Sequence, residues 1–170
     1  MIVGLEGVVR LKKMDRDGLL LCELQAETFE ESAETLETSS EIFIRRFMNS
    51  DVASLMDNND FLQMNIQPKD IIERIEEQYG HSKYGSVKYS RDELYWIGYV
   101  YRYYSYTYEL SSVRVYKTVK PKELRGLYLA YHTMDPSQAI ERILEAKNLI
   151  MNENLELQRQ YEIFKKIRTL

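Results

Sequence analysis

The chain has 170 residues, 44% of them hydrophobic and 29% charged, and its net charge is −4. These values fit one soluble globular domain, and the acidic balance argues against a protein that binds nucleic acid over its whole surface. One cysteine excludes an internal disulfide and two histidines argue against zinc, so we expect no metal and no cofactor.

No segment is apolar over the length of a membrane span, and at the N-terminus apolar residues precede the basic ones, the reverse of a secretory signal. We therefore expect a cytoplasmic protein without a membrane partner. Glycine and proline are scarce, at 7 and 3 residues, which favours long helices joined by short links. The sequence predicts an all-α, single-domain helical bundle of six to eight helices.

Three regions follow from the pattern along the chain. We predict an N-terminal extension over residues 1–18, a helical domain over 19–147 and a C-terminal amphipathic helix over 148–170. Met14 leaves open whether residues 1–13 belong to the fold.

The run LLLCELQAETFEESAETL, residues 19–36, has apolar residues mostly three or four apart, which predicts a helix with one buried face. Cys22 lies in an apolar stretch and is expected to be a buried side chain without a nucleophilic role. Seven glutamates lie between Glu23 and Glu41 with no basic residue among them. This acidic face is either a solvated surface or a docking surface for a basic partner.

Helical signals continue through the next fifty residues. TSSEIFIRRFMNS begins with capping serines, and a short helix is expected after Ser50. QPKDIIERIEEQYG is the clearest helix, because Pro68 suits the first helical position and Gly80 ends the pattern. Its buried stripe consists of Ile71, Ile72 and Ile75.

Eight aromatic side chains fall within sixteen residues in YWIGYVYRYYSYTYEL, residues 95–110. Ser90 and Glu93 have the spacing of a capping box, which marks a helix start just before this stretch. The tyrosine alternation changes phase at Tyr103 and Tyr104, so a strand would need a bulge there. We predict a helix, central in the bundle, against the β-propensity of tyrosine and threonine.

Two tyrosine-rich stripes run along that predicted helix. One consists of Tyr95, Tyr99, Tyr103 and Tyr106, and the other of Ile97, Tyr101, Tyr104 and Tyr108. Aromatic enrichment marks both cores and interfaces, and tyrosine hydroxyls need a partner or water. The candidate partner-binding residues are therefore Tyr95, Tyr99, Tyr103 and Tyr106, while Gly98 would let a second helix approach closely.

The segment Lys88–Arg125 is the basic part of the chain and carries eight cations, Arg102 among them. SSVRVYKTVKPKELRGLYLAY predicts two short helices with a tight corner, loosely like a helix-turn-helix. As an alternative function, the protein would be a DNA-binding regulator that contacts phosphates through Arg114, Lys117, Lys120 and Lys122.

Arg125 and His132 are seven residues apart on a predicted helix, so both can face one way. This pattern resembles the motif of the HEPN family of all-α ribonucleases, in which arginine and histidine cleave RNA through its 2′-OH. Gly126 departs from that motif, where a polar residue is usual. The resemblance implies a further alternative, a ribonuclease with Arg125 and His132 as catalytic residues. Phosphate-loop, nucleophile-elbow and calcium-loop templates find no match.

The long strings SSEIFIRRFMNSDVA, NIQPKDIIERIEEQYG and VYKTVKPKELRGLYLAYHTMDPSQAIERILEA resemble a small family of bacterial all-α proteins, from about Leu24 to Ala146. Genes of this family often lie in small operons beside a toxin of the ADP-ribosyltransferase-like type. The resemblance implies a non-enzymatic, antitoxin-like component of a toxin–antitoxin or defence module. Its partner would be a protein, such as a cognate toxin, and a homo-oligomer stays open.

Overall fold

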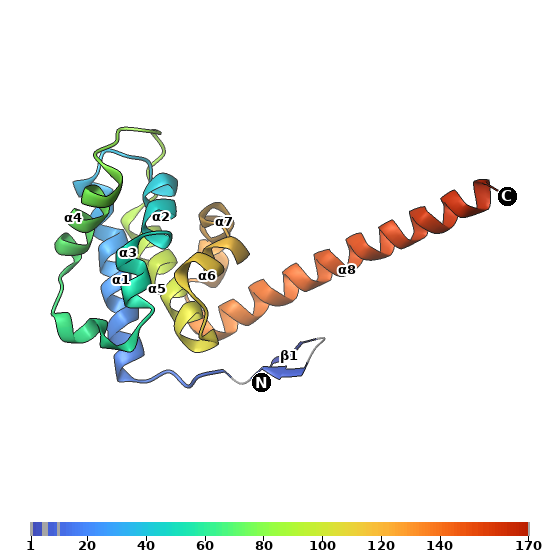
Figure 1. Ribbon diagram of the computed structural model, residues 1–170, viewed down its shortest axis with the longest axis horizontal. Coiled ribbons are helices and arrows are strands. Elements are labelled where there is room, and N and C mark those ends of the chain that lie inside the picture. The colour runs from blue at the N-terminus through green and yellow to red at the C-terminus, as the bar shows by residue number, and fades with distance from the viewer. Residues whose placement is uncertain (1, 5–6, 10, 170) are drawn as a thin grey trace. The chain divides into compact units, whose positions relative to one another are not determined.

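The computed structural model describes the backbone of residues 2–4, 7–9 and 11–169. The predicted all-α class is confirmed (Figure 1). The helices are α1 Arg16–Thr35, α2 Ser40–Met48, α3 Asp51–Met56, the 3₁₀ helix η1 Asn59–Met64, α4 Pro68–Tyr79, α5 Arg91–Tyr108, α6 Ser112–Thr118, α7 Pro121–Tyr131 and α8 Pro136–Arg168. The strands β1 Ile2–Gly4 and β2 Gly7–Val9 form a short antiparallel hairpin.

Serine caps begin several helices, as their sequences predict. Ser39, Ser50 and Ser111 each accept a backbone N–H from the first turn of α2, α3 and α6. The predicted capping box at the start of α5 is confirmed, since Ser90 accepts the N–H of Glu93 at 3.1 Å and Glu93 accepts that of Ser90 at 3.0 Å. These local bonds fix where α5 starts and hence which of its faces is buried.

The tyrosine-rich segment is a helix, and it pairs with α1 at the centre of the unit Met1–Thr133. The pair is antiparallel, because Arg91 at the start of α5 meets Glu30 in α1, and Tyr106 near its end meets Asp15. Figure 1 shows α4 on one side of the pair and α6 with α7 on the other. A Cβ at Gly98 would lie 2.9 Å from the Gln25 carbonyl oxygen of α1, so the predicted close approach is confirmed.

Aromatic and aliphatic side chains fill the space around this pair. The Phe29 ring lies edge-on to Phe43 and Phe47, at centroid distances of 5.6 and 4.9 Å. The predicted stripe of α4 is confirmed, since Ile71, Ile72 and Ile75 are all buried. The core thus combines the first half of the chain with the tyrosine helix.

The ends of the domain differ from the expected boundaries. α1 begins at Arg16, inside the expected 1–18 extension, because Asp15 caps it by accepting the Gly18 N–H at 2.8 Å. Residues before the cap also contact the bundle, since the Lys12 N–H donates to the Thr107 carbonyl at 2.7 Å. The sequence indicated a separate helix from residue 148, but α8 runs unbroken from Pro136 to Arg168. Good helix formers around Asn152 and Asn154 outweigh these two weak ones.

By its internal contacts the chain divides into two compact units, Met1–Thr133 and Met134–Leu170. The second unit consists of α8 and the residues at its two ends. The expected boundary between residues 147 and 148 falls within the continuous helix.

Candidate partner-binding surface

Three of the four predicted partner-binding tyrosines form a stacked row on α5, which we call the tyrosine ladder: Tyr95, Tyr99 and Tyr103. The ring centroids of Tyr95 and Tyr99 are 6.4 Å apart with planes 23° from parallel. The ring centroids of Tyr99 and Tyr103 are 6.3 Å apart, and their planes are 26° from parallel. The i, i+4 spacing on a helix produces this stacking, and all three side chains are partly exposed. The ladder is therefore a regular, partly exposed aromatic surface.

The second predicted stripe belongs to the core. Ile97, Tyr101 and Tyr104 are buried, and the Tyr101 hydroxyl donates to the Val119 carbonyl at 2.6 Å. Burial raises the pKa of Tyr101 far above its ordinary value, so this hydroxyl stays protonated. The Tyr101 contact thus ties the end of α6 to α5, whereas the tyrosine ladder of the first stripe faces outward.

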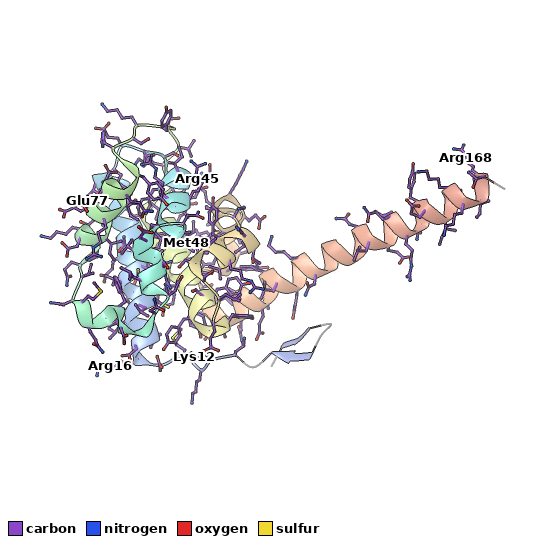
Figure 2. The ribbon with its side chains drawn as sticks, viewed as in Figure 1. Lys12, Arg16, Arg45, Met48, Glu77 and Arg168 are labelled. Carbon is purple, nitrogen blue, oxygen red and sulfur yellow. The ribbon has the colours of Figure 1, made fainter. Side chains whose placement is uncertain are left out.

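The fourth predicted residue, Tyr106, is occupied within the protein. Its hydroxyl donates to Asp15 Oδ1 at 2.7 Å, and the Lys12 ammonium lies 4.1 Å from its ring centroid. Tyr106 therefore holds the chain before α1 against the end of α5. Figure 2 labels Lys12 and Arg16 at this same end of the unit.

An acidic row on α1 lies beside the tyrosine ladder. Glu23, Glu27 and Glu30 follow one another at helical spacing, and Glu23 and Glu27 are exposed. Burial raises the pKa of Tyr95, and these three carboxylates raise it further. Burial also raises the pKa of Tyr99 to about 12, with Cys22 and Glu23 adding to the effect. The hydroxyls of Tyr95 and Tyr99 are therefore neutral donors at neutral pH, next to negative charge.

One end of the acidic row is paired with a cation. Arg91, at the start of α5, donates to Glu30 at 3.1 Å and also pairs with Glu34. Glu23 and Glu27 lie before Glu30 on α1, on the side towards Tyr99. We define the ladder surface as Tyr95, Tyr99, Tyr103, Glu23 and Glu27.

Arg102 occupies the centre of a buried polar network. Its side chain comes from the middle of α5, and the residue is only 1% exposed. The guanidinium donates to Gln25 Oε1 at 2.7 Å, Asp57 Oδ1 at 2.7 Å and Ser112 Oγ at 2.9 Å. Asp57 in turn accepts the N–H and the hydroxyl of Ser112 at 3.0 and 2.7 Å. The network ties α1, the end of α3 and the start of α6 to α5.

A polar cavity of about 310 Å³ adjoins this network. Lys12, Asp57, Arg102, Tyr106 and Glu109 are among the side chains that line it. Arg102 and Asp57 already bond to each other and to Ser112, and Tyr106 to Asp15, so these three groups are committed to the fold.

The proposed phosphate-contacting cations are all on the surface of α6 and α7. Arg114, Lys117, Lys120 and Lys122 are exposed, and the Lys120 ammonium lies 4.1 Å from the centroid of the Tyr116 ring. A shallow cavity of about 280 Å³ lies between these helices and α2, lined by Arg45, Lys120 and Lys122 but also by Glu41. The DNA-binding alternative stays a prediction.

The predicted ribonuclease pair makes two separate sets of structural contacts. Arg125 donates through Nε to Glu93 Oε2 at 3.0 Å and lies 4.3 Å from the centroid of the Tyr89 ring, which fastens α7 to the start of α5. His132 ends α7, where its ring stacks on Tyr128 at 4.5 Å and Nδ1 lies 2.8 Å from the Tyr128 carbonyl oxygen. The ribonuclease alternative stays a prediction.

Cys22 is fully buried in α1, as expected. Burial raises the pKa of its thiol to about 12, so the reactive thiolate is scarce at pH 8. We expect a colorimetric thiol reagent to modify the folded protein at least about 100-fold more slowly than the urea-unfolded chain. Equal rates in the two states would contradict the packing described around α1.

The raised pKa of Cys22 also makes the stability of the protein depend on pH. Above the ordinary pKa of 9.0 the unfolded thiol ionises while the folded thiol stays protonated. The contribution of Cys22 to stability is therefore complete below pH 9 and declines as the pH rises towards 12.

Comparisons with protein-family models, curated proteins and solved structures find no match to this chain. The family resemblance of the sequence therefore stays a prediction. In the part of the chain that the structure describes, no three acidic, histidine or cysteine side chains gather as metal ligands do. No described helix combines the length and the apolar character needed to cross a bilayer.

Proposed function

We propose that the protein is a non-enzymatic interaction component that binds a basic protein partner through the ladder surface. The observation that carries this proposal is the stacked, partly exposed row of three tyrosines beside the exposed carboxylates of Glu23 and Glu27 on α1. Tyrosine is enriched in protein interfaces because it covers much apolar area with few rotatable bonds and keeps a polar tip. An antitoxin-like component that covers a cognate toxin fits this chemistry.

Neighbouring contacts keep the ladder ordered before any partner binds. Each ring stacks on the next, and α5 itself is fixed by the α1 contact and the Arg102 network. A preordered aromatic surface loses little side-chain entropy on binding. The glutamates beside it would attract a basic partner and set its orientation.

Charge reversal tests the acidic half of this proposal. The double variant Glu23→Lys with Glu27→Lys places two cations beside the ladder, where a basic partner would be repelled. When the chain is co-expressed with the products of its neighbouring genes, we expect the partner to co-purify with the unchanged protein and not with this variant.

Glu73→Lys with Glu77→Lys is the matched control, because it makes the same change in charge at exposed, helically spaced glutamates on α4. We expect this control to retain the partner. Equal retention by both double variants would rule out an acidic contact at the ladder surface. Raising the salt concentration should weaken the unchanged complex, since these charges are exposed.

A further inference from the structure

The C-terminal half of α8 has an apolar face that is exposed to solvent. Five side chains on it are between 53% and 72% exposed: Leu157, Tyr161, Ile163, Phe164 and Ile167. At 3.6 residues per turn they share less than half of the helix circumference. The remaining arc of this half of the helix is polar apart from Leu155. Figure 2 shows the side chains of α8 as far as Arg168.

The same face has opposite charges at its two ends. By helical geometry, Glu156 lies on it just before Leu157 and Arg168 just after Ile167. Lys165 and Lys166 add positive charge at the C-terminal end, and Lys165 borders the face. The face therefore begins at Glu156, whose carboxylate lies 3.9 Å from Arg159 Nη1, and ends at the basic Arg168.

This order of charges is complementary to itself when reversed. Two antiparallel copies with fully overlapping faces are centred at residue 162, so that Leu157 is level with the partner's Ile167. Glu156 is then level with the partner's Arg168. A parallel pair would instead place Glu156 beside Glu156 and Arg168 beside Arg168, and like charges at close range are destabilising.

We propose that the C-terminal half of α8 is a self-association surface, on which a second copy of this chain packs antiparallel. Packing buries the five exposed apolar side chains of each copy and sets opposite charges at the same level. This inference is independent of the ladder surface, which belongs to the other compact unit.

Sedimentation of the full chain over a range of concentrations tests the proposal. We expect a reversible monomer–dimer equilibrium with a dissociation constant in the micromolar range for so short a contact. Phe164→Glu introduces a charge into the apolar face and should raise this constant at least about tenfold.

Leu155→Glu is the matched control, because Leu155 is also exposed, at 59%, but lies on the opposite arc. It should change the dissociation constant by less than about twofold. Both substitutions are at exposed positions, and unchanged melting temperatures will show that both variants fold. A chain that stays monomeric at about 200 μM, or a dimer that Phe164→Glu leaves intact, overturns the proposal. A monomer whose α8 face takes up a lipid vesicle or another protein also overturns it.

Cross-linking tests the orientation. Leu157→Cys mixed with Ile167→Cys should give a cross-linked heterodimer with a short bis-maleimide, while each variant alone should give little. Self-cross-linking of each variant alone would show a parallel pair and contradict the proposal. The native Cys22 is fully buried and serves as the internal background.

Discussion

Replacing Arg102 by methionine is expected to lower the free energy of unfolding by about 3–5 kcal/mol. The substitution keeps the buried volume near that of arginine but removes every donor of the guanidinium. Asp57 and Gln25 would lose their contacts at 2.7 Å, and Ser112 would lose its contact at 2.9 Å. Because Arg102 is almost completely buried, its partners inside the bundle lose these bonds without gaining water in exchange, apart from Asp57, whose side chain is 19% exposed beside the cavity. Urea unfolding followed by circular dichroism measures the loss.

The same network allows a double-mutant cycle. Asp57→Ala in the Arg102→Met background removes the carboxylate that the first change leaves without its cation. The double variant should therefore be less destabilised than the sum of the two single variants, with a coupling of about 1–3 kcal/mol. Additive effects, or an Arg102→Met protein as stable as the unchanged one, would show that the network does not hold α5, α1 and α6 together.

Gly98→Ala is expected to destabilise the protein by about 1–3 kcal/mol, although alanine is the better helix former. The new Cβ would lie 2.9 Å from the Gln25 carbonyl oxygen, 2.9 Å from the Phe29 ring and 3.0 Å from the Ala26 Cα. Two of these neighbours are backbone atoms of α1, which move only if the whole helix moves. Thermal and urea unfolding give the change in stability.

Gly126→Ala is the control, and we expect it to change the stability in the opposite direction. Gly126 is also inside a helix, α7, and a Cβ there would have nothing within 4 Å. Without a clash, the gain in helix propensity should stabilise the protein by about 0.5–1 kcal/mol. If both alanine variants gained stability alike, the close contact between α1 and α5 would be wrong.

Features that depend on residues close together in the sequence could be predicted. The Ser90–Glu93 capping box marked the start of α5, Pro68 and Gly80 enclosed α4, and the phase change at Tyr103 and Tyr104 favoured a helix. Each of these signals acts within a few residues along the chain, so no tertiary contact was needed to interpret it.

Features that depend on distant residues could not be predicted in this way. The sequence placed Arg102 among the eight cations of the basic segment and gave it no role in the core, because its partners Gln25 and Asp57 lie 77 and 45 residues away in sequence. The same limit applies to Tyr106, whose partner Asp15 is 91 residues away. Three rings of the Tyr95–Tyr106 stripe stack as a row, and only tertiary contacts separate them from the tyrosine that anchors the N-terminal segment.

The tyrosine helix therefore combines two roles that its sequence left open. One face, with Tyr101 and Tyr104, belongs to the core, and the ladder on another face stays partly exposed. The chain has fourteen tyrosines and five phenylalanines. A tyrosine in the core needs a hydrogen-bond partner for its hydroxyl, whereas the hydroxyl of an exposed tyrosine can bond to water or to another protein.

Affinity of the isolated partner for ladder variants is the most direct measurement of the proposed function. Tyr99→Ala removes the middle ring, and we expect it to weaken binding by about 2 kcal/mol, close to 30-fold, by titration calorimetry. Tyr84→Ala, at a loop tyrosine that is 76% exposed, is the control and should bind as the unchanged protein does. If a folded Tyr99→Ala protein binds the partner with unchanged affinity, the ladder is not the contact surface and the account is contradicted.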